Sequence, residues 1–309
     1  MAIQAATAFA ASPLPNGFTA KVVAHSGQTI SGTIDATGYD LGVYIGPGVQ
    51  DVKVAGATVT GANDEGILVQ DTSDVLIEDS SVEGNAVSPF AMDQEVKGIV
   101  LAGTTNVLVR QNTVQANEDG GISVLDDGPN STFAPVAIDT APVAGAGNAI
   151  LGNLVKNNLG GCGIVLSAKN PGGGVSSNAI SGNTVTGGVG GIVVAGGAFG
   201  PVSVANNIVS NNVVSGGYLP GISLHAFGPG VISGTQLAGN VLSNNGTSEI
   251  SKETTGIEIF AVPHVGTIVG TSVRNDSVSD DYFGVFHVGD TGTHIASLTT
   301  TGVTVPIFP

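Results

Sequence analysis

The chain has 309 residues, with 24 acidic against 8 basic residues and a formal net charge of −16. This balance disfavours a nucleic-acid partner or an anionic membrane surface, because Lys and Arg must neutralise phosphate groups there. No run of 18 or more apolar residues occurs, so no membrane-spanning segment is expected. The single cysteine, Cys162, excludes an intramolecular disulfide framework.

The first predicted element is the segment 1–27, which has two interpretations. Ala8-Phe9-Ala10 is like the small-residue end of a secretory signal, but it lacks a basic start and an apolar stretch before it. Alternatively, the segment covers the apolar end that the first coil of a solenoid exposes. Residues 1–27 are therefore predicted to be an N-terminal cap or a residual leader.

Residues 28–309 repeat a block of glycine, hydrophobe, any residue and hydrophobe. The block begins at Gly42, Gly66, Gly98, Gly121, Gly163, Gly191, Gly221, Gly256 and Gly284. Spacings of 23 to 42 residues between these glycines are typical of a solenoid. In stacked parallel strands the side chains alternate, so the two hydrophobes point into the tube and the residues at +2 and +4 from the glycine point out. The sequence predicts one all-β domain, a parallel β-helix of about nine to ten coils.

A second block, rich in Val and Asn, precedes each glycine block. Its recurring asparagines are Asn112, Asn153, Asn183, Asn212 and Asn240. They are predicted to lie at turns, where asparagine tolerates left-handed backbone, and to form side-chain ladders between coils.

The two blocks together resemble the right-handed parallel β-helix superfamily of pectate lyases, polygalacturonases, alginate epimerases and NosD-type repeat proteins, over roughly residues 28–300. This resemblance implies a secreted or periplasmic carbohydrate-active enzyme of lyase, hydrolase, transferase or isomerase type that requires no cofactor. The catalytic signatures of the named enzymes are missing, so no catalytic residue is assigned by motif.

Three segments interrupt the repeat, at residues 84–95, 126–147 and 246–255. Function on a rigid scaffold concentrates in such excursions. The predicted outer face of the glycine blocks is mostly apolar, which predicts that an excursion, a terminal segment or a second copy of the chain covers it, or that it forms a groove that contacts sugar or lipid. A homo-oligomer formed through this face is one of these alternatives.

Polar exceptions on the outer face gather late in the chain. His225 at +4 and Glu258 at +2 of the next coil are expected within hydrogen-bonding reach on adjacent rungs, with Ser223 beside Glu258. His264 and Asp290 follow the last two strands and are expected at the same edge, with Ser223 and Asp290 as candidate substrate-binding residues. We assign His225 as general base, Glu258 as acid or orienting carboxylate and His264 as substrate contact. Ordinary surface or turn residues are the alternative interpretation.

Asp126, Asp127 and Lys169 are a second set of candidate substrate-binding residues, at turns of earlier coils. Stacked acidic turns also make Ca²⁺ a candidate ligand. No short-spaced histidine pair predicts another metal, and His287, at an inward position, is expected to be a hydrogen-bonded core residue.

Three functions remain open from the sequence. The first is the glycan-active enzyme above. The second is a non-catalytic surface binding or structural repeat protein, in which His225 and Glu258 are separated and exposed. The third is a small-molecule enzyme whose apolar pocket is roofed by residues 126–147.

Overall fold

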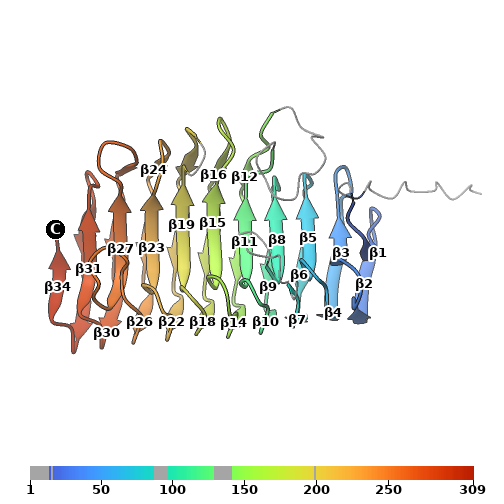
Figure 1. Cartoon of the computed structure of the whole chain (residues 1–309), viewed down its shortest axis with the longest axis horizontal. Coiled ribbons are helices and arrows are strands. Elements are labelled where there is room, and N and C mark those ends of the chain that lie inside the picture. Colours follow the sequence, from blue (N-terminus) through green and yellow to red (C-terminus); the bar gives the residue numbers. More distant parts are fainter. Residues whose placement is uncertain (1–13, 15–16, 87–96, 129–140, 198–199) are drawn as a thin grey trace, which may run out of the picture.

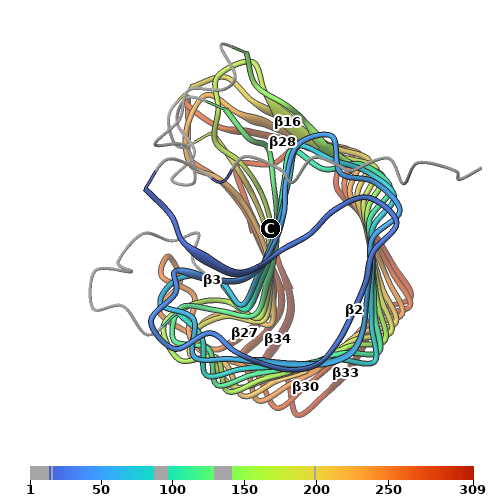
Figure 2. The ribbon, with the colours of Figure 1, turned by 90° about the vertical axis from the view of Figure 1, so that its right-hand side faces the viewer.

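The computed structural model describes residues 14, 17–86, 97–128, 141–197 and 200–309, and in these residues it contains 34 β-strands and no helix. The strands form three parallel sheets that wind into one tube, seen from the side in Figure 1 and from its end in Figure 2. The predicted all-β parallel β-helix is confirmed.

Sheet A has eleven strands: β1 (Ala20–Val23), β3 (Leu41–Ile45), β5 (Ile67–Gln70), β8 (Ile99–Ala102), β11 (Ile122–Leu125), β15 (Ile164–Ala168), β19 (Ile192–Gly196), β23 (Ile222–Ala226), β27 (Thr255–Ala261), β31 (Phe283–Val288) and β34 (Val305–Phe308). Sheet C has five: β12 (Gly145–Ala146), β16 (Gly174–Ser176), β20 (Ser203–Ala205), β24 (Val231–Ser233) and β28 (Thr267–Val269).

Sheet B has eighteen strands, two in most coils. They are β2 (Thr29–Asp35), β4 (Lys53–Thr60), β6 (Leu76–Glu78), β7 (Ser81–Glu83), β9 (Leu108–Arg110), β10 (Thr113–Gln115), β13 (Ala149–Leu151), β14 (Leu154–Lys156), β17 (Ala179–Ser181), β18 (Thr184–Thr186), β21 (Ile208–Ser210), β22 (Val213–Ser215), β25 (Gln236–Ala238), β26 (Val241–Ser243), β29 (Ser272–Arg274), β30 (Ser277–Ser279), β32 (His294–Ala296) and β33 (Thr299–Thr301).

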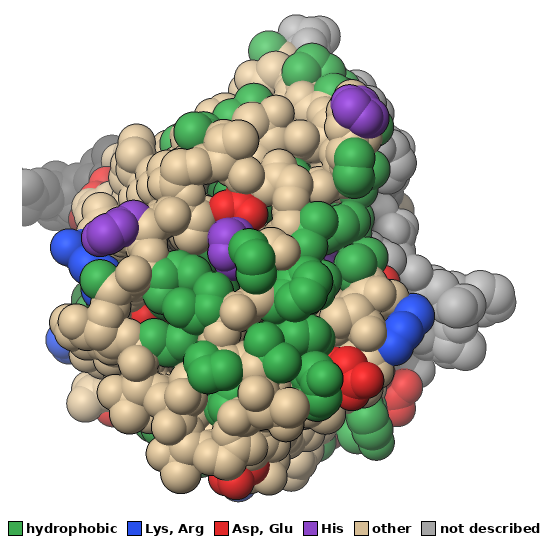
Figure 3. Space-filling model, turned by 90° about the vertical axis from the view of Figure 1, so that its left-hand side faces the viewer, with side chains coloured by type: hydrophobic (Ala, Val, Ile, Leu, Met, Phe, Trp, Pro, Cys, Tyr) green, Lys and Arg blue, Asp and Glu red, His purple; other side chains and the backbone are tan. Residues whose placement is uncertain are grey.

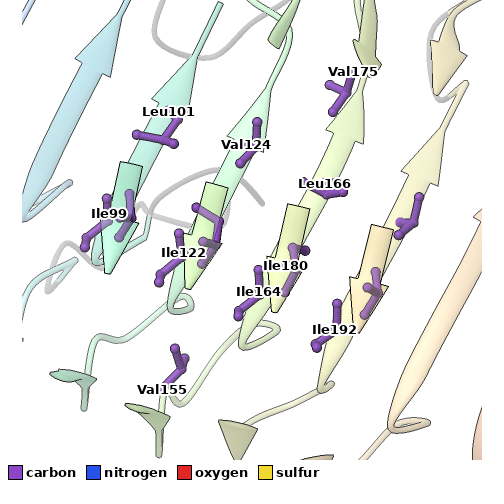
Figure 4. Close-up of a cluster of buried hydrophobic side chains, with 14 of the residues drawn as sticks. Ile99, Leu101, Ile122, Val124, Val155, Ile164, Leu166, Val175, Ile180 and Ile192 are labelled. Atoms are coloured by element: carbon purple, nitrogen blue, oxygen red, sulfur yellow. The ribbon is translucent and has the colours of Figure 1, made fainter. Parts of the chain in front are cut away.

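The glycine blocks lie in register in sheet A, as predicted. Ile122 and Val124 pair with Ile164 and Leu166 of the next coil, and all four side chains belong to one continuous core (Figure 4). The residue at +2 points to the outer face. This register places every polar exception at +2 or +4 on the outside of the tube.

Glycine begins each block because the next coil leaves no room for a side chain. A Cβ on Gly191 would lie 2.1 Å from the carbonyl oxygen of Gly221 and 2.4 Å from Cγ1 of Val214. Sheet A has eleven strands and so spans ten turns of the tube, within the predicted range, because β1 and β34 extend it at each end without the glycine block.

The asparagines stack in a buried ladder along the tube. Asn183 donates from Nδ2 to Oδ1 of Asn212 at 3.0 Å and accepts at its own Oδ1 from Asn153. The ladder continues to Asn240, whose Nδ2 donates to Asp276. The predicted ladder is confirmed, but the left-handed backbone lies at neighbouring residues instead, such as Asn211 with φ of 54°. The side chains of the ladder are therefore structural.

The outer face of sheet A is covered within the chain at its N-terminal coils. Tyr44, Leu68 and Val100 are fully buried there, and Leu14 and Phe18 pack against the cluster that they form. A terminal segment thus supplies part of the predicted cover. Farther along, Val165 and Val193 stay partly exposed, so self-association through this face remains a prediction for those coils.

At the other end of the tube, apolar side chains gather on the surface (Figure 3). Ile307 and Phe308 of β34 are 43% and 41% exposed, and Ile295, Leu298 and Val303 are partly buried against the core. The last coil thus exposes part of the core. The described part of the chain contains no helix of the length and apolarity needed to cross a membrane.

Asp64 makes stability depend on pH. Burial, and then the charge of Asp40, raises the pKa of Asp64 from 3.8 to about 6. Between about pH 4 and 6 the folded chain holds a proton that the unfolded chain has lost, so this carboxyl lowers the free energy of unfolding as pH rises through that window.

Asp64→Asn is therefore expected to raise the melting temperature more at pH 7 than at pH 4, measured by calorimetry on both proteins. Asp51→Asn, at an exposed position, is the control. Equal effects of Asp64→Asn at both pH values would show that Asp64 is not the group responsible.

Candidate functional site

The two strongest candidate residues lie on neighbouring strands of sheet A. In the register of β23 and β27, Ser223 pairs with Glu258 and His225 pairs with Phe260. His225 and Glu258 are thus diagonal neighbours on rungs about 4.8 Å apart. The structure brings together the pair that the sequence predicted.

Glu258 is the centre of a chain of three hydrogen-bonded side chains. Its Oε2 shares a hydrogen bond with Nε2 of His225, and its Oε1 accepts one from Oγ of Ser248. The side chain of Glu258 is 1% exposed and that of His225 is 13% exposed. The carboxylate is therefore enclosed, and the imidazole remains accessible.

Ser248 comes from the excursion at residues 246–255, which the structure folds over the outer face of sheet A. Its Oγ accepts hydrogen bonds from the backbone N–H groups of Ile250 and Ser251, both at 3.1 Å. A bridge between Thr247 and Thr254 closes the excursion. The turn thus fixes the hydroxyl that holds Glu258.

Aromatic rings surround the imidazole of His225. The ring of Phe227 lies edge-on at 4.9 Å between centroids, and that of Phe260 at 6.3 Å. Phe227 is 49% exposed. On the preceding rung, His225 pairs with Ala195, which is small and partly exposed. The imidazole therefore has the rings of Phe227 and Phe260 as aromatic neighbours and the small side chain of Ala195 on the preceding rung.

Burying the carboxylate of Glu258 is energetically unfavourable, and the packing of this face does not require it. Leu68 and Val100 occupy the equivalent place on earlier rungs and are also fully buried, so an apolar residue fits there. Enclosing an ionised group is unfavourable, and such groups concentrate at functional sites. The arrangement orients an accessible imidazole for proton transfer.

Ser223, predicted beside Glu258, lies there with 3% of its surface exposed. The other two late candidates, which lie in the described part of the chain, make no hydrogen bond or ion pair with His225 or Glu258. His264 lies on an exposed turn after β27, with φ of 64°. Oδ1 of Asp290 accepts a hydrogen bond from Nδ1 of His287 at 3.0 Å. The position of His264 and Asp290 at the same edge as the pair remains a prediction, while His287 has the expected hydrogen-bond partner.

The earlier acidic turns are held in structural hydrogen bonds. Asp126 accepts from the backbone N–H groups of Lys169 and Asn170 at 2.8 and 3.0 Å. Asp127 accepts from Nε2 of Gln70 at 2.7 Å. Both aspartates are almost fully buried.

The described residues contain no group of three or more His, Cys, Asp or Glu side chains that is arranged to hold a metal ion. Substrate contact by Asp126, Asp127 and Lys169, and Ca²⁺ binding, remain predictions. The excursions 84–95 and 126–147 lie partly outside the described residues, and so does the roof expected over a small-molecule pocket.

Sequence reasoning missed Ser248 and Phe227. The interruption of the repeat at residues 246–255, directly before Glu258, was a signal for the first. Phe227 lies two residues after His225, in a loop between sheets A and C, whose direction the repeat does not determine.

Two family descriptions match the chain: "Right handed beta helix region" over residues 15–138 and "Protein of unknown function" (DUF1565) over residues 129–265. None of the curated proteins matches it significantly. PfbA, a surface adhesin of Streptococcus pneumoniae, is similar in structure with a TM-score of 0.56 and 15% identity, over 89% of this chain and 68% of that one.

The mannuronan C-5 epimerase AlgE4 A-module of Azotobacter vinelandii gives a TM-score of 0.40 and 12% identity, over 91% of this chain and 89% of that one. The catalytic domain of a GH87 alpha-1,3-glucanase gives 0.40 and 13%, over 98% and 68%. At these identities the similarities concern the fold alone.

Proposed function

We propose that this chain, a right-handed parallel β-helix protein, is a glycan-active enzyme in which His225 transfers a proton at the outer face of sheet A. The observation that carries the proposal is the enclosed Ser248–Glu258–His225 chain. Glu258 orients the imidazole, and Ser248 holds Glu258. The accessible side of His225 then faces the bound sugar or a water molecule.

The surroundings of the pair favour a neutral glycan. The described side chains that make hydrogen bonds or ring contacts with His225 and Glu258 are those of Ser248, Phe227 and Phe260, none of which carries a positive charge. A uronate would need a cation to neutralise its carboxylate, and the net charge of −16 further disfavours the binding of an anionic sugar. Exposed Phe227 offers an apolar surface to a sugar ring. Activation of water or a sugar hydroxyl by His225 therefore fits better than a lyase or epimerase step on a uronate.

The proposal includes an extracytoplasmic setting, where polysaccharides are encountered. A non-catalytic adhesin is the alternative function, and the same experiment separates the two. Neutral and uronate-containing polysaccharides are incubated with the protein and with His225→Ala, and products are followed by chromatography. We expect products from a neutral glycan with the unmodified protein only. Binding of a glycan without product, in both proteins, would favour the adhesin and overturn the catalytic proposal.

A further inference from the structure

The C-terminal end of the tube is apolar and open. Figure 3 shows the molecule from this end, with apolar side chains gathered near the middle of the view. Ile307 and Phe308 of β34 are exposed, and Ile295, Leu298 and Val303 pack at the edge of the core and are only partly buried. Apolar surface of this kind marks a contact surface, because the terminal repeat of a solenoid leaves its core uncovered unless something packs on it.

The N-terminal end of the tube does not offer a matching apolar surface. In the first coil the core residues Ala24, Ile30 and Ile34 are buried. Val22 is partly buried, and none of the large apolar side chains in the described residues 17–40 is exposed. A second copy stacked head to tail would therefore place an open end against a closed one. Within the described residues, the end that matches the open C-terminal end is another C-terminal end.

The open end carries almost no formal charge, although the chain is acidic. Residues 282–309 contain one of the 24 acidic residues, Asp290, and none of the 8 Lys and Arg residues. The carboxylate of Asp290 is hydrogen-bonded to His287, and its side chain is 4% exposed. Two chains that each carry a net charge of −16 repel each other when their acidic surfaces meet. Few like charges come together when two C-terminal ends meet, so the charge pattern favours contact between two such ends.

Pro306 determines the kind of contact that this end can make. It occupies the glycine position of the last coil, opposite Gly284 in the register of β31 and β34. In an earlier coil the block glycine donates its N–H onward, as Gly163 does to the carbonyl of Gly190 at 2.9 Å. Proline has no N–H, so the outer edge of β34 lacks this donor. The open end is therefore suited to the packing of side chains and not to the continuation of sheet A by another strand.

We propose that the C-terminal end is the contact surface of a homodimer, in which two chains meet end to end about a two-fold axis. Such a surface is self-complementary, because the apolar side chains of one chain pack against the same side chains of the other. This contact differs from self-association through the outer face of sheet A. His225 lies on β23, three strands of sheet A from β34, and the dimer does not depend on the function proposed for it.

Sedimentation velocity of the 309-residue chain over a range of concentrations tests the proposal. We expect a mass of about twice the 30.4 kDa of one chain at the higher concentrations. Ile307→Glu places a carboxylate from each chain in the contact, and it is expected to raise the dissociation constant of the dimer about tenfold or more. Val241→Glu is the matched control, because Val241 is 47% exposed but lies on β26 of sheet B. The control should leave the mass unchanged, and circular dichroism checks the fold of each variant.

A mixture of Ile307→Glu and Ile307→Lys tests the two-fold symmetry. Like charges meet when either variant is alone and opposite charges meet in the mixture, so we expect monomers from each variant and dimers from the mixture. A mixture that stays monomeric would overturn the two-fold contact. The proposal would also be overturned by a chain that is monomeric at every concentration, by an open series of larger assemblies, or by a dimer that Val193→Glu dissociates and Ile307→Glu does not.

Discussion

Replacing Asn183 by alanine is expected to lower the free energy of unfolding by about 3–5 kcal/mol. Asn183 is fully buried, and its Oδ1 accepts from both the backbone N–H and Nδ2 of Asn153, at 2.9 and 3.0 Å. Its Nδ2 also donates to the carbonyl of Ile150 at 2.9 Å. Alanine leaves these groups without partners in a site that water does not reach.

Urea unfolding followed by circular dichroism measures the effect. Asn211→Gly is the matched control, because Asn211 is exposed and its φ of 54° suits glycine; a change within about 0.5 kcal/mol is expected. Asn183→Asp keeps the acceptor but places a carboxylate oxygen against the carbonyl of Ile150 and Oδ1 of Asn212, so it should destabilise the chain at least as much as alanine at neutral pH. A loss below about 1 kcal/mol for Asn183→Ala would show that the ladder contributes little to stability.

Glu258→Leu is expected to abolish activity, lowering turnover by about 100-fold or more, while leaving the free energy of unfolding unchanged or about 1–3 kcal/mol higher. Leucine already occupies the equivalent place at Leu68, where it is fully buried. The substitution removes an enclosed carboxylate, and the partly exposed imidazole of His225 can hydrogen-bond to water instead. Ser248 keeps its two backbone donors.

Thermal unfolding and turnover measured on the same preparation test this prediction. Glu258→Gln is the companion variant, since it retains the shape and hydrogen-bonding atoms of the side chain without the charge. A loss of several kcal/mol in Glu258→Leu would indicate that Glu258 is a structural residue, and the case for a functional pair would fail.

The β-helix and the contact between His225 and Glu258 could both be predicted from the sequence, because both follow from the repeat. Once the glycines are aligned, the side-chain period of two places His225 and Glu258 on the outer face of adjacent rungs, and the register confirms it. The same alignment correctly assigned Ile122 and Val124 to the core.

Positions beyond the strands did not follow from the repeat. Turn lengths differ between coils, so the repeat did not reveal that Asp290 hydrogen-bonds to His287. Ser248 reaches Glu258 only because a local turn folds the excursion back. No period encodes that path.

The most direct test of the central claim is the kinetics of His225→Ala on a glycan that the protein converts. If His225 transfers the proton, His225→Ala lowers kcat by about 100-fold or more. The dissociation constant of the glycan changes by less than about threefold, because Phe227 and the neighbouring residues of sheet A remain in place. Full turnover by His225→Ala would contradict the account.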